Sequence, residues 1–400
     1  MRQPVLTIFY QFNPWHSTIG GIQTVIRSFI KYAPSDWTVR LVGTAHTSVD
    51  PTGQWQDAEL AGRPIQFMPL IYISNDNIRQ RIPTTVKYTL ALLKHRFVSD
   101  FLHFHRLEPS LAAFGWTGDK TLFIHNDIHQ QMAVAQKQSD STSILWQHLP
   151  AAYFALERLL VHQFNQILSC NSQSASFYQQ QYPAIANKVA LIKNTVDGDI
   201  FYPLSAPERE AKRIQLTKQF NLHPETHFIL FAGRLHPQKD PILLLQSIAA
   251  LEHPHVHLLV AGDGELTTVM QAEIARLQLT PRVTLLGALS QADLANLHRL
   301  SSVLVLTSIH EGLPLVALEA LACGTPVVTT PCGETPHLLT AESGIVCDDR
   351  APQTIAAAIQ QVLLNPDIYS VQSCLRAAQP YSARTVISHL YDDMLSRWQP

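Results

Sequence analysis

Short apolar runs rich in Val, Ile, Leu and Phe alternate along this chain with longer segments in which apolar residues recur at helical spacing. The runs include VLTIFYQF, TVRLVGT, FLHFH and TLFIHND in the first half, and HFILFAG, VHLLVAGDG, RVTLLG and VLVLTS in the second. Apolar strands of this kind are buried on both faces, and their alternation with helices predicts parallel sheets covered by helices on both sides. Because both halves repeat the pattern, the sequence predicts two doubly wound α/β domains.

The apolar rhythm stops near NTVDGDIFYPLSAPERE, a segment that also contains two prolines. We therefore place a first domain at 1–198 and a second at 199–381. The last segment, 382–400, has apolar residues on one helical stripe, which predicts an amphipathic helix that packs back on the first domain. Ligands of doubly wound proteins bind at the carboxyl ends of the strands, so we expect a ligand in a cleft between the two domains.

Composition excludes several classes of protein. Lys plus Arg (29) nearly balance Asp plus Glu (31), so the overall charge does not point to nucleic acid. Five cysteines occur without a C-x-x-C pair, which suits a reducing compartment. The first residues make a poor signal peptide, and no window approaches about 18 uninterrupted apolar residues. We therefore expect a cytoplasmic protein.

The segment EGLPLVALEALACGTPVVTT carries two glutamates at the start of an apolar helix. Glu311 lies on the loop after the strand VLVLTS, and Pro314 suits the first helical position. The unpaired N–H groups of a helix start favour phosphate. Glu319 lies among apolar neighbours, where a carboxylate needs polar partners. An ion pair with Lys or Arg and the hydroxyls of a polyhydroxylated ligand are both open.

Two further loops carry groups suited to an anion. Arg234 and Lys239 follow the strand that ends at Gly233, and two cations at the edge where EGLP emerges suit a diphosphate. Gly20 and Gly21 lie between the first strand and the first helix, where backbone N–H groups can approach a phosphate or a sugar closely. The pattern is not G-x-G-x-x-G, so the fingerprint of nicotinamide cofactors is absent.

Taken together, these motifs resemble the retaining GT-B glycosyltransferases of family 4, the glycosyl transferases group 1. The motifs that carry the resemblance, in chain order, are Gly20-Gly21, IHND with His125, IKNTVD with Asn194, GRLHPQKD, VAGDGE with Gly262 and Gly264, VTLLGAL with Leu286, and Glu311 to Glu319. The resemblance implies the GT-B fold, with two Rossmann-like doubly wound parallel-sheet domains facing a central cleft. The first domain would bind the acceptor and the second the nucleotide sugar.

The resemblance also implies a role for each matched residue. Arg234 and Lys239 would stabilise the departing nucleoside diphosphate, Glu311 would contact the donor sugar and Glu319 the ribose hydroxyls. His125 would lie near the sugar ring and, with Arg234, Lys239 and Glu311, make up the catalytic set. The other donor-binding residues that it implies are Gly20, Gly21, Asn194, Gly233, Gly262, Gly264, Leu286, Gly312, Leu313, Pro314 and Leu315.

The activity implied is metal-independent transfer of a hexosyl group from a UDP- or GDP-sugar to a hydroxyl acceptor, with retention of configuration. The acceptor would be a growing glycan or a lipid-linked oligosaccharide, and no cofactor or nucleic acid takes part. A nucleotide-sugar epimerase or phosphorylase on the same fold, or a non-catalytic nucleotide-sugar-binding protein, remains as the alternative. This chain has Asp240 and Thr195 where the family often has glycine, which puts the fine geometry near Lys239 and Asn194 in doubt.

Three patterns in the sequence bear on metal binding and on contact with a membrane. The run DGD at 197–199 matches the D-x-D pattern of the other glycosyltransferase fold, but it falls at the expected linker. His103 and His105 alternate on one face of a strand without a recognisable third ligand, so we expect them to line the acceptor cleft. The basic segment 78–97 predicts either a peripheral helix on the inner face of a membrane or a solvated helix packed on the first domain.

Overall fold

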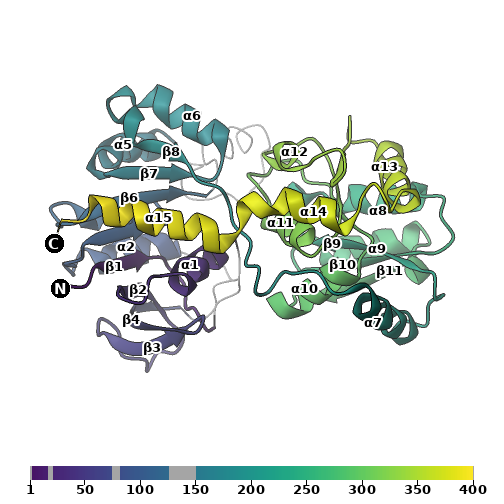
Figure 1. Cartoon of the computed structure of the whole chain (residues 1–400). Helices are drawn as coiled ribbons and strands as arrows, with labels where there is room; N and C mark the ends of the chain where they lie inside the picture. Colours follow the sequence, from purple (N-terminus) through teal and green to yellow (C-terminus); the bar gives the residue numbers. More distant parts are fainter. Residues whose placement is uncertain (1, 17–20, 74–81, 126–149, 400) are drawn as a thin grey trace. The chain divides into compact units, whose positions relative to one another are not determined.

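We describe the protein in a computed structural model that covers residues 2–16, 21–73, 82–125 and 150–399. The chain forms two compact units (Figure 1). Unit 1 comprises Met1–Lys193 and Val386–Pro400, and unit 2 comprises Asn194–Thr385. The chain therefore passes from one unit to the other between Lys193 and Asn194, slightly before the boundary of 198/199 expected from the sequence.

Unit 1 is built on an eight-stranded sheet of order β3-β4-β2-β1-β5-β6-β7-β8. The strands are β1 (Val5–Phe9), β2 (Thr38–Ala45), β3 (Gln56–Leu60), β4 (Arg63–Tyr72), β5 (Phe101–Phe104), β6 (Asp119–Ile124), β7 (Gln166–Ser169) and β8 (Val189–Leu191). All neighbours pair in parallel except β3 and β4, which pair antiparallel. Ala61 and Gly62 join that hairpin with φ of 54° and 74°, the conformation that two-residue hairpin turns require.

The helices of unit 1 bury apolar faces in the cores beside this sheet. They are α1 (Gly21–Lys31), α2 (Thr84–Leu92), α5 (Pro150–Leu160) and α6 (Ser172–Gln181), with 3-10 turns η1 (Glu108–Ala113), η2 (Val161–Gln163) and η3 (Pro183–Lys188). The last helix, α15 (Ala383–Arg397; yellow in Figure 1), places its apolar stripe in the core that contains α1. Its buried Tyr391 donates a hydrogen bond of 2.9 Å from its hydroxyl to the carbonyl of Phe29. From Val386 onward, α15 is therefore part of unit 1.

Unit 2 is built on a six-stranded, wholly parallel sheet of order β11-β10-β9-β12-β13-β14. The strands are β9 (His227–Ala232), β10 (Val256–Ala261), β11 (Val283–Gly287), β12 (Val303–Leu306), β13 (Val327–Thr329) and β14 (Gly344–Val346). Strands β9, β10, β12 and β13 are almost entirely buried, as their continuous apolar sequences predict. Two cores, on opposite faces of this sheet, pack against the helices.

The helices of unit 2 alternate with its strands along the chain. They are α7 (Ala206–Gln219), α8 (Pro241–Ala250), α9 (Thr267–Arg276), α10 (Gln291–Leu300), α11 (Leu315–Ala322), α12 (Thr335–Leu338), α13 (Pro352–Leu364) and α14 (Val371–Ala378), with 3-10 turns η4 (Pro237–Lys239), η5 (Thr280–Arg282) and η6 (Gln379–Tyr381). Strands β9 and β12 are neighbours in the sheet. The loops that leave their carboxyl ends therefore emerge side by side, and these loops carry Arg234, Lys239 and Glu311.

The part of the basic segment that the structure describes is half-buried. Residues 78–81 lie outside the described residues, whereas 84–92 form α2, which buries Tyr88, Thr89 and Leu92. The Tyr88 hydroxyl donates to the Val42 carbonyl at 2.6 Å, so one face of α2 is fixed in unit 1. Among the described residues, none of the helices combines the length and the apolar character that crossing a bilayer would need.

Candidate functional site

Lys239 and Glu311, 72 positions apart in the sequence, form an ion pair at the adjacent carboxyl ends of β9 and β12. The Ser308 hydroxyl donates to the same Glu311 oxygen at 2.7 Å. The two charged side chains are only 20% and 10% exposed, so this pair is held in a partly desolvated place. The structure therefore brings together two of the four predicted catalytic residues through a direct contact that the sequence did not predict.

The loop that carries Lys239 is fixed by residues that sequence reasoning missed. The Thr307 hydroxyl donates to the carbonyls of Lys239 and Asp240, both at 2.9 Å. The Arg350 guanidinium donates to the Asp240 carboxylate at 2.6 Å and to the Ser308 carbonyl at 2.7 Å. Arg350 thus joins the loop after β9 to the loop after β12. The sequence pointed to Arg350 only indirectly: Asp240, its partner, is a carboxylate where the family often has glycine.

Arg234 lies on the same loop but is exposed. Gly233, before it, follows β9 with φ of 153°. Gly262 follows β10, and a Cβ added there would lie 1.9 Å from the Gly233 carbonyl oxygen, so only glycine fits. The backbones after β9 and β10 therefore touch, which places Gly233 and Gly262 in one small region. The predicted Gly264 lies in that loop as well, where its N–H donates to the Asp263 carboxylate at 2.7 Å.

Helix α11 begins at Leu315, with Pro314 as its N-cap. The prediction that Pro314 occupies the first helical position is therefore wrong by one residue, a difference that lies within the usual uncertainty of helix ends. The N-cap residue Pro314 gives this helix start no side-chain hydrogen bond. The predicted Asn194 donates from its side-chain amide to the Leu313 carbonyl at 2.8 Å, which fixes the loop just before the helix.

Gly333 supports the same loop from another side and was not predicted. It has φ of 60°, and a Cβ there would lie 2.1 Å from the carbonyl oxygen of Gly312. The N–H of Glu334 donates to this carbonyl at 2.8 Å. The turn that contains Gly333 therefore packs directly against the backbone at Glu311 and Gly312.

Glu319 is buried inside α11, with 7% of its surface exposed. The ion pair with Lys or Arg that the sequence left open is not found among the described residues; the ionisable group beside Glu319 is His298, with Nε2 3.8 Å from Oε2. That oxygen and both ring nitrogens of the fully buried His298 lack hydrogen-bond partners within the described part of the chain. Buried polar atoms in proteins are nearly always satisfied, so the Glu319 oxygen still needs a donor, and a neutral His298 ring still needs one donor and one acceptor.

In unit 1, His125 follows β6 and contacts a second histidine. Nδ1 of His105 lies 2.8 Å from Nε2 of His125, and the sulfur of Cys170 lies 3.9 Å from its Nδ1. Burial, with a smaller contribution from Arg106, lowers the pKa of His125 to about 3. The ring is therefore neutral at neutral pH, and it cannot act as a cation there. The ring of His103 packs against Phe29 and Phe123, as that of His105 does, and the described part of the chain shows no hydrogen bond between His103 and this pair.

The remaining predicted residues are placed as follows. Gly20 lies outside the described residues, while Gly21 is the exposed first residue of α1. Leu286 is half-buried in β11, next to Gly287, whose carbonyl accepts the Gly262 N–H at 2.8 Å. The run DGD at 197–199 forms a turn in which the Asp197 carboxylate accepts the N–H of Asp199 at 3.0 Å.

Comparison with protein families and relatives gives a consistent result. Residues 212–378 match the model of the family glycosyl transferases group 1. A D-inositol 3-phosphate glycosyltransferase of Segniliparus rotundus is 31% identical over 218 residues, which are 53% of this chain and 47% of that protein. One of Jonesia denitrificans is 28% identical over 265 residues, 62% of this chain and 60% of that protein. The chain thus spans between about half and three fifths of the length of these curated relatives.

Solved structures match over nearly the whole chain. A sucrose-phosphate synthase from Thermosynechococcus elongatus has a TM-score of 0.78 at 19% identity, covering 99% of this chain and 100% of that chain. The Anabaena protein Alr3699/HepE, in complex with UDP and glucose, has a TM-score of 0.70 at 16% identity, with 99% and 100% covered. With the two parallel-sheet units, these matches confirm the predicted fold class, GT-B with two Rossmann-like domains.

Proposed function

We propose, from the membership of residues 212–378 in the glycosyl transferases group 1, that the chain is a glycosyltransferase with a nucleoside diphosphate sugar as its donor. The finer assignment is retaining, metal-independent transfer of a hexosyl group from a UDP- or GDP-sugar to a hydroxyl. The D-inositol 3-phosphate glycosyltransferases among the relatives and the UDP complex of the Anabaena protein support a donor of this class. The contacts within unit 2 suggest which residues would bind this donor.

The observation that carries the proposal is the carboxylate of Glu319, a residue that keeps 7% of its surface accessible inside α11. Its Oε2 is enclosed beside His298, which leaves Oε1 as the oxygen to bind a ligand. A carboxylate oxygen accepts strong hydrogen bonds from hydroxyl groups. Lys and Arg do not fill this place within the described residues, which favours the ligand hydroxyls over the ion pair. We assign these hydroxyls to the ribose of the donor nucleotide.

The diphosphate would lie between the loop after β9 and the start of α11. Arg234 is exposed and free to turn toward an anion, and Lys239 supplies a second positive charge. The first N–H groups of α11 receive no side-chain hydrogen bond from the N-cap residue Pro314, and the helix dipole adds partial positive charge there. These groups stabilise negative charge as the bond from the anomeric carbon to the phosphate oxygen breaks.

We infer front-face transfer on this basis. The departing phosphate oxygen takes the electron pair of the broken bond, the acceptor oxygen bonds to the anomeric carbon on the same face, and its proton passes to the departing phosphate. Glu311 is already paired with Lys239, so its role is to bind sugar hydroxyls and to position Lys239 rather than to act as a nucleophile. The proposed place of neutral His125 near the sugar ring rests on the family resemblance, because its two ring nitrogens contact His105 and Cys170.

The acceptor is proposed to be a growing glycan or a lipid-linked oligosaccharide bound by unit 1. Leu90 of α2 and Leu93, which caps its carboxyl end, have 56% and 52% of their surfaces accessible, beside Lys94 and Arg96. This pairing of apolar and basic side chains is consistent with a peripheral membrane contact. Co-sedimentation with vesicles that does not depend on anionic lipid would remove this part of the proposal.

A panel of UDP-, GDP- and ADP-hexoses in a thermal unfolding assay tests the proposal and identifies the donor. We expect one base to raise the Tm selectively, by linkage of binding to folding. The selected sugar should then be transferred or slowly hydrolysed in the presence of EDTA. If no nucleoside diphosphate sugar raises the Tm, the proposal is wrong; stabilisation without any turnover would instead identify a nucleotide-sugar-binding protein.

A further inference from the structure

Five histidines gather at the amino ends of β9 and β10, the sheet edge opposite the loops of the candidate site. They are His223, His227, His253, His255 and His257, from the segments NLHPETH and EHPHVH. Strands β9 and β10 pair in parallel over six residues, so this edge lies about 20 Å from the carboxyl ends of the strands. These histidines therefore take no part in donor binding as described above.

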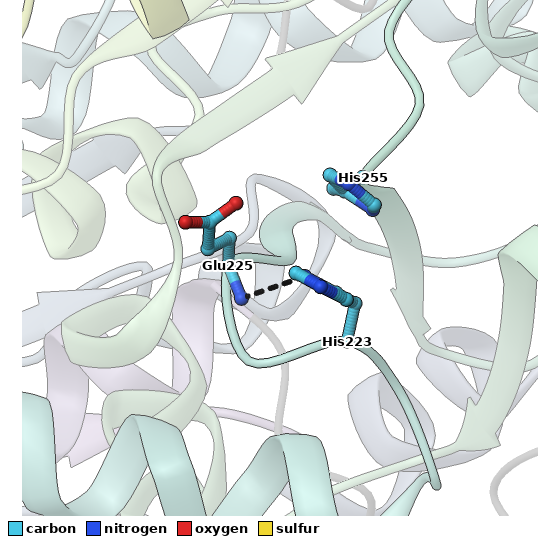
Figure 2. Close-up of side chains that lie close together, drawn as sticks. All are labelled: His223, Glu225 and His255. Atoms are coloured by element: carbon cyan, nitrogen blue, oxygen red, sulfur yellow. Dashed lines mark hydrogen bonds between the residues drawn. The ribbon is translucent and has the colours of Figure 1, made fainter.

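Three side chains of this region converge. His223 and Glu225 lie on the loop before β9, and His255 lies just before β10 (Figure 2). One ligand atom from each lies within 4.8 Å of the others. The imidazoles of His223 and His255 are stacked, with ring centroids 4.1 Å apart and planes within 14°. His223 and Glu225 are exposed, so side-chain rotation alone can shorten the separations to the roughly 3.3 Å between neighbouring ligands of a tetrahedral ion.

One hydrogen bond in this region competes with metal binding. Nδ1 of His223 accepts the N–H of Glu225 at 3.3 Å, a long bond that closes a His-Pro-Glu turn. A neutral imidazole has one donor and one acceptor nitrogen, so this bond is given up when His223 binds a metal. Neutral imidazole is the form that binds metal ions.

We propose that His223, Glu225 and His255 form a Zn²⁺ site, with water as the fourth ligand. Two imidazoles and one carboxylate are typical Zn²⁺ ligands, whereas Mg²⁺ and Ca²⁺ prefer sites made of oxygen atoms alone. The ion joins the loop before β9 to the loop before β10, and so clamps the amino ends of two central strands of unit 2. The site is separate from the sugar chemistry and independent of the proposed function.

Asparagine substitutions separate metal binding from the shape of the turn. In the segment Asn13-Pro14-Trp15, the Asn13 side chain accepts the N–H of Trp15 at 3.0 Å, at the same spacing as His223 and Glu225. His223→Asn therefore keeps an acceptor for the turn and removes the imidazole. His253→Asn is the matched control, because Nδ1 of His253 also accepts the N–H two residues on, at 3.3 Å, without belonging to the trio.

The experiment titrates the untagged full chain with Zn²⁺ in a calorimeter and with Co²⁺ in a spectrophotometer. We expect the wild type and His253→Asn to bind one Zn²⁺ equivalent more than His223→Asn, and to show the visible Co²⁺ bands of tetrahedral coordination. Saturating Zn²⁺ should raise their Tm by about 5 °C or more. Equal Zn²⁺ stoichiometry in the wild type and His223→Asn, or no uptake at about 100 µM Zn²⁺, overturns the proposal.

A second variant keeps the test valid if His223→Asn does not fold. Glu225→Gln changes an exposed side chain and leaves the backbone N–H that closes the turn. It should fold like the wild type and weaken Zn²⁺ binding at least tenfold, because the site loses its only anionic ligand. Unchanged affinity in Glu225→Gln would show that the bound ion lies elsewhere and would also overturn the proposal.

Discussion

Replacement of Glu319 by glutamine should separate donor binding from folding. One carboxylate oxygen of Glu319 is buried without a hydrogen-bond partner, 3.8 Å from a ring nitrogen of His298. Burying a charge in that state is unfavourable, so the neutral amide should leave the free protein as stable as the wild type or more stable. If ribose hydroxyls bind the carboxylate, the same substitution removes one or two hydrogen bonds to a charged group.

The expected loss of nucleotide affinity follows from the strength of those hydrogen bonds. Hydrogen bonds to charged groups contribute about 1.5 to 3 kcal/mol each, so the loss of one bond weakens nucleotide binding by roughly 10- to 100-fold. Glutamine can still accept one hydrogen bond through its carbonyl oxygen, and the lower end of the range is therefore expected for Glu319→Gln. Glu319→Ala would also leave a cavity in α11, so it is the less informative variant.

Calorimetry with two ligands makes the test specific for ribose. The wild type should bind the nucleoside diphosphate identified by the thermal panel tightly and its 2′,3′-dideoxy analogue at least tenfold more weakly. Glu319→Gln should bind the nucleotide more weakly and discriminate less between the two ligands, because the amide accepts a weaker hydrogen bond than the carboxylate. Discrimination as large in Glu319→Gln as in the wild type, or a Tm of the free variant several degrees below that of the wild type, would refute the reasoning.

Three further predictions concern other contacts. Lys239→Ala should lower kcat/KM by at least about 100-fold, because it removes a diphosphate-binding cation and leaves Glu311 without its partner; wild-type activity in a steady-state assay would contradict the assignment. Burial, with a smaller contribution from Arg397, lowers the pKa of His103 from 6.5 to about 3. The unfolded chain binds a proton at His103 that the folded chain does not bind. The contribution of His103 to the free energy of unfolding is therefore fully present above about pH 6.5 and falls by about 1.4 kcal/mol per pH unit below it. Urea unfolding between pH 7 and 5 should therefore give a free energy of unfolding that depends less steeply on pH in His103→Phe than in the wild type. The same pH dependence in both proteins would contradict the prediction. Tyr391→Phe should cost about 1 kcal/mol in the same assay at pH 7, since it removes one hydrogen bond from α15; no change would show that this bond contributes nothing.

The sequence predicted those parts of the fold that follow from local patterns. Continuous apolar runs identified β9, β10, β12 and β13, because a strand buried on both faces of a parallel sheet admits few polar residues. The helix that carries Glu319 was predicted from its apolar run and the glycine that ends it. The prediction missed its first residue by one, because helix ends depend on backbone hydrogen bonds that a residue pattern describes only approximately.

Contacts between distant segments could not be predicted in the same way. The ion pair of Lys239 with Glu311 depends on β9 and β12 being neighbours, which follows from the strand order rather than from spacing in the sequence. Arg350 and His298 are common residue types in unremarkable surroundings, and only the folded chain shows what they touch. The same holds for the stacked His223 and His255 before two paired strands.

Asp240 shows how this chain keeps a glycine-like backbone without glycine. Its φ of 44° lies in the left-handed region, which disfavours most side chains but tolerates aspartate. The carboxylate compensates for the strain in two ways: it caps α8 by accepting the N–H of Leu243 at 3.2 Å, and it pairs with Arg350. Arg350 in turn holds the loop that leads to Glu311. The departure from the family pattern therefore adds a link between the two loops of the ion pair, so the position of Lys239 depends on residues that need never touch the sugar.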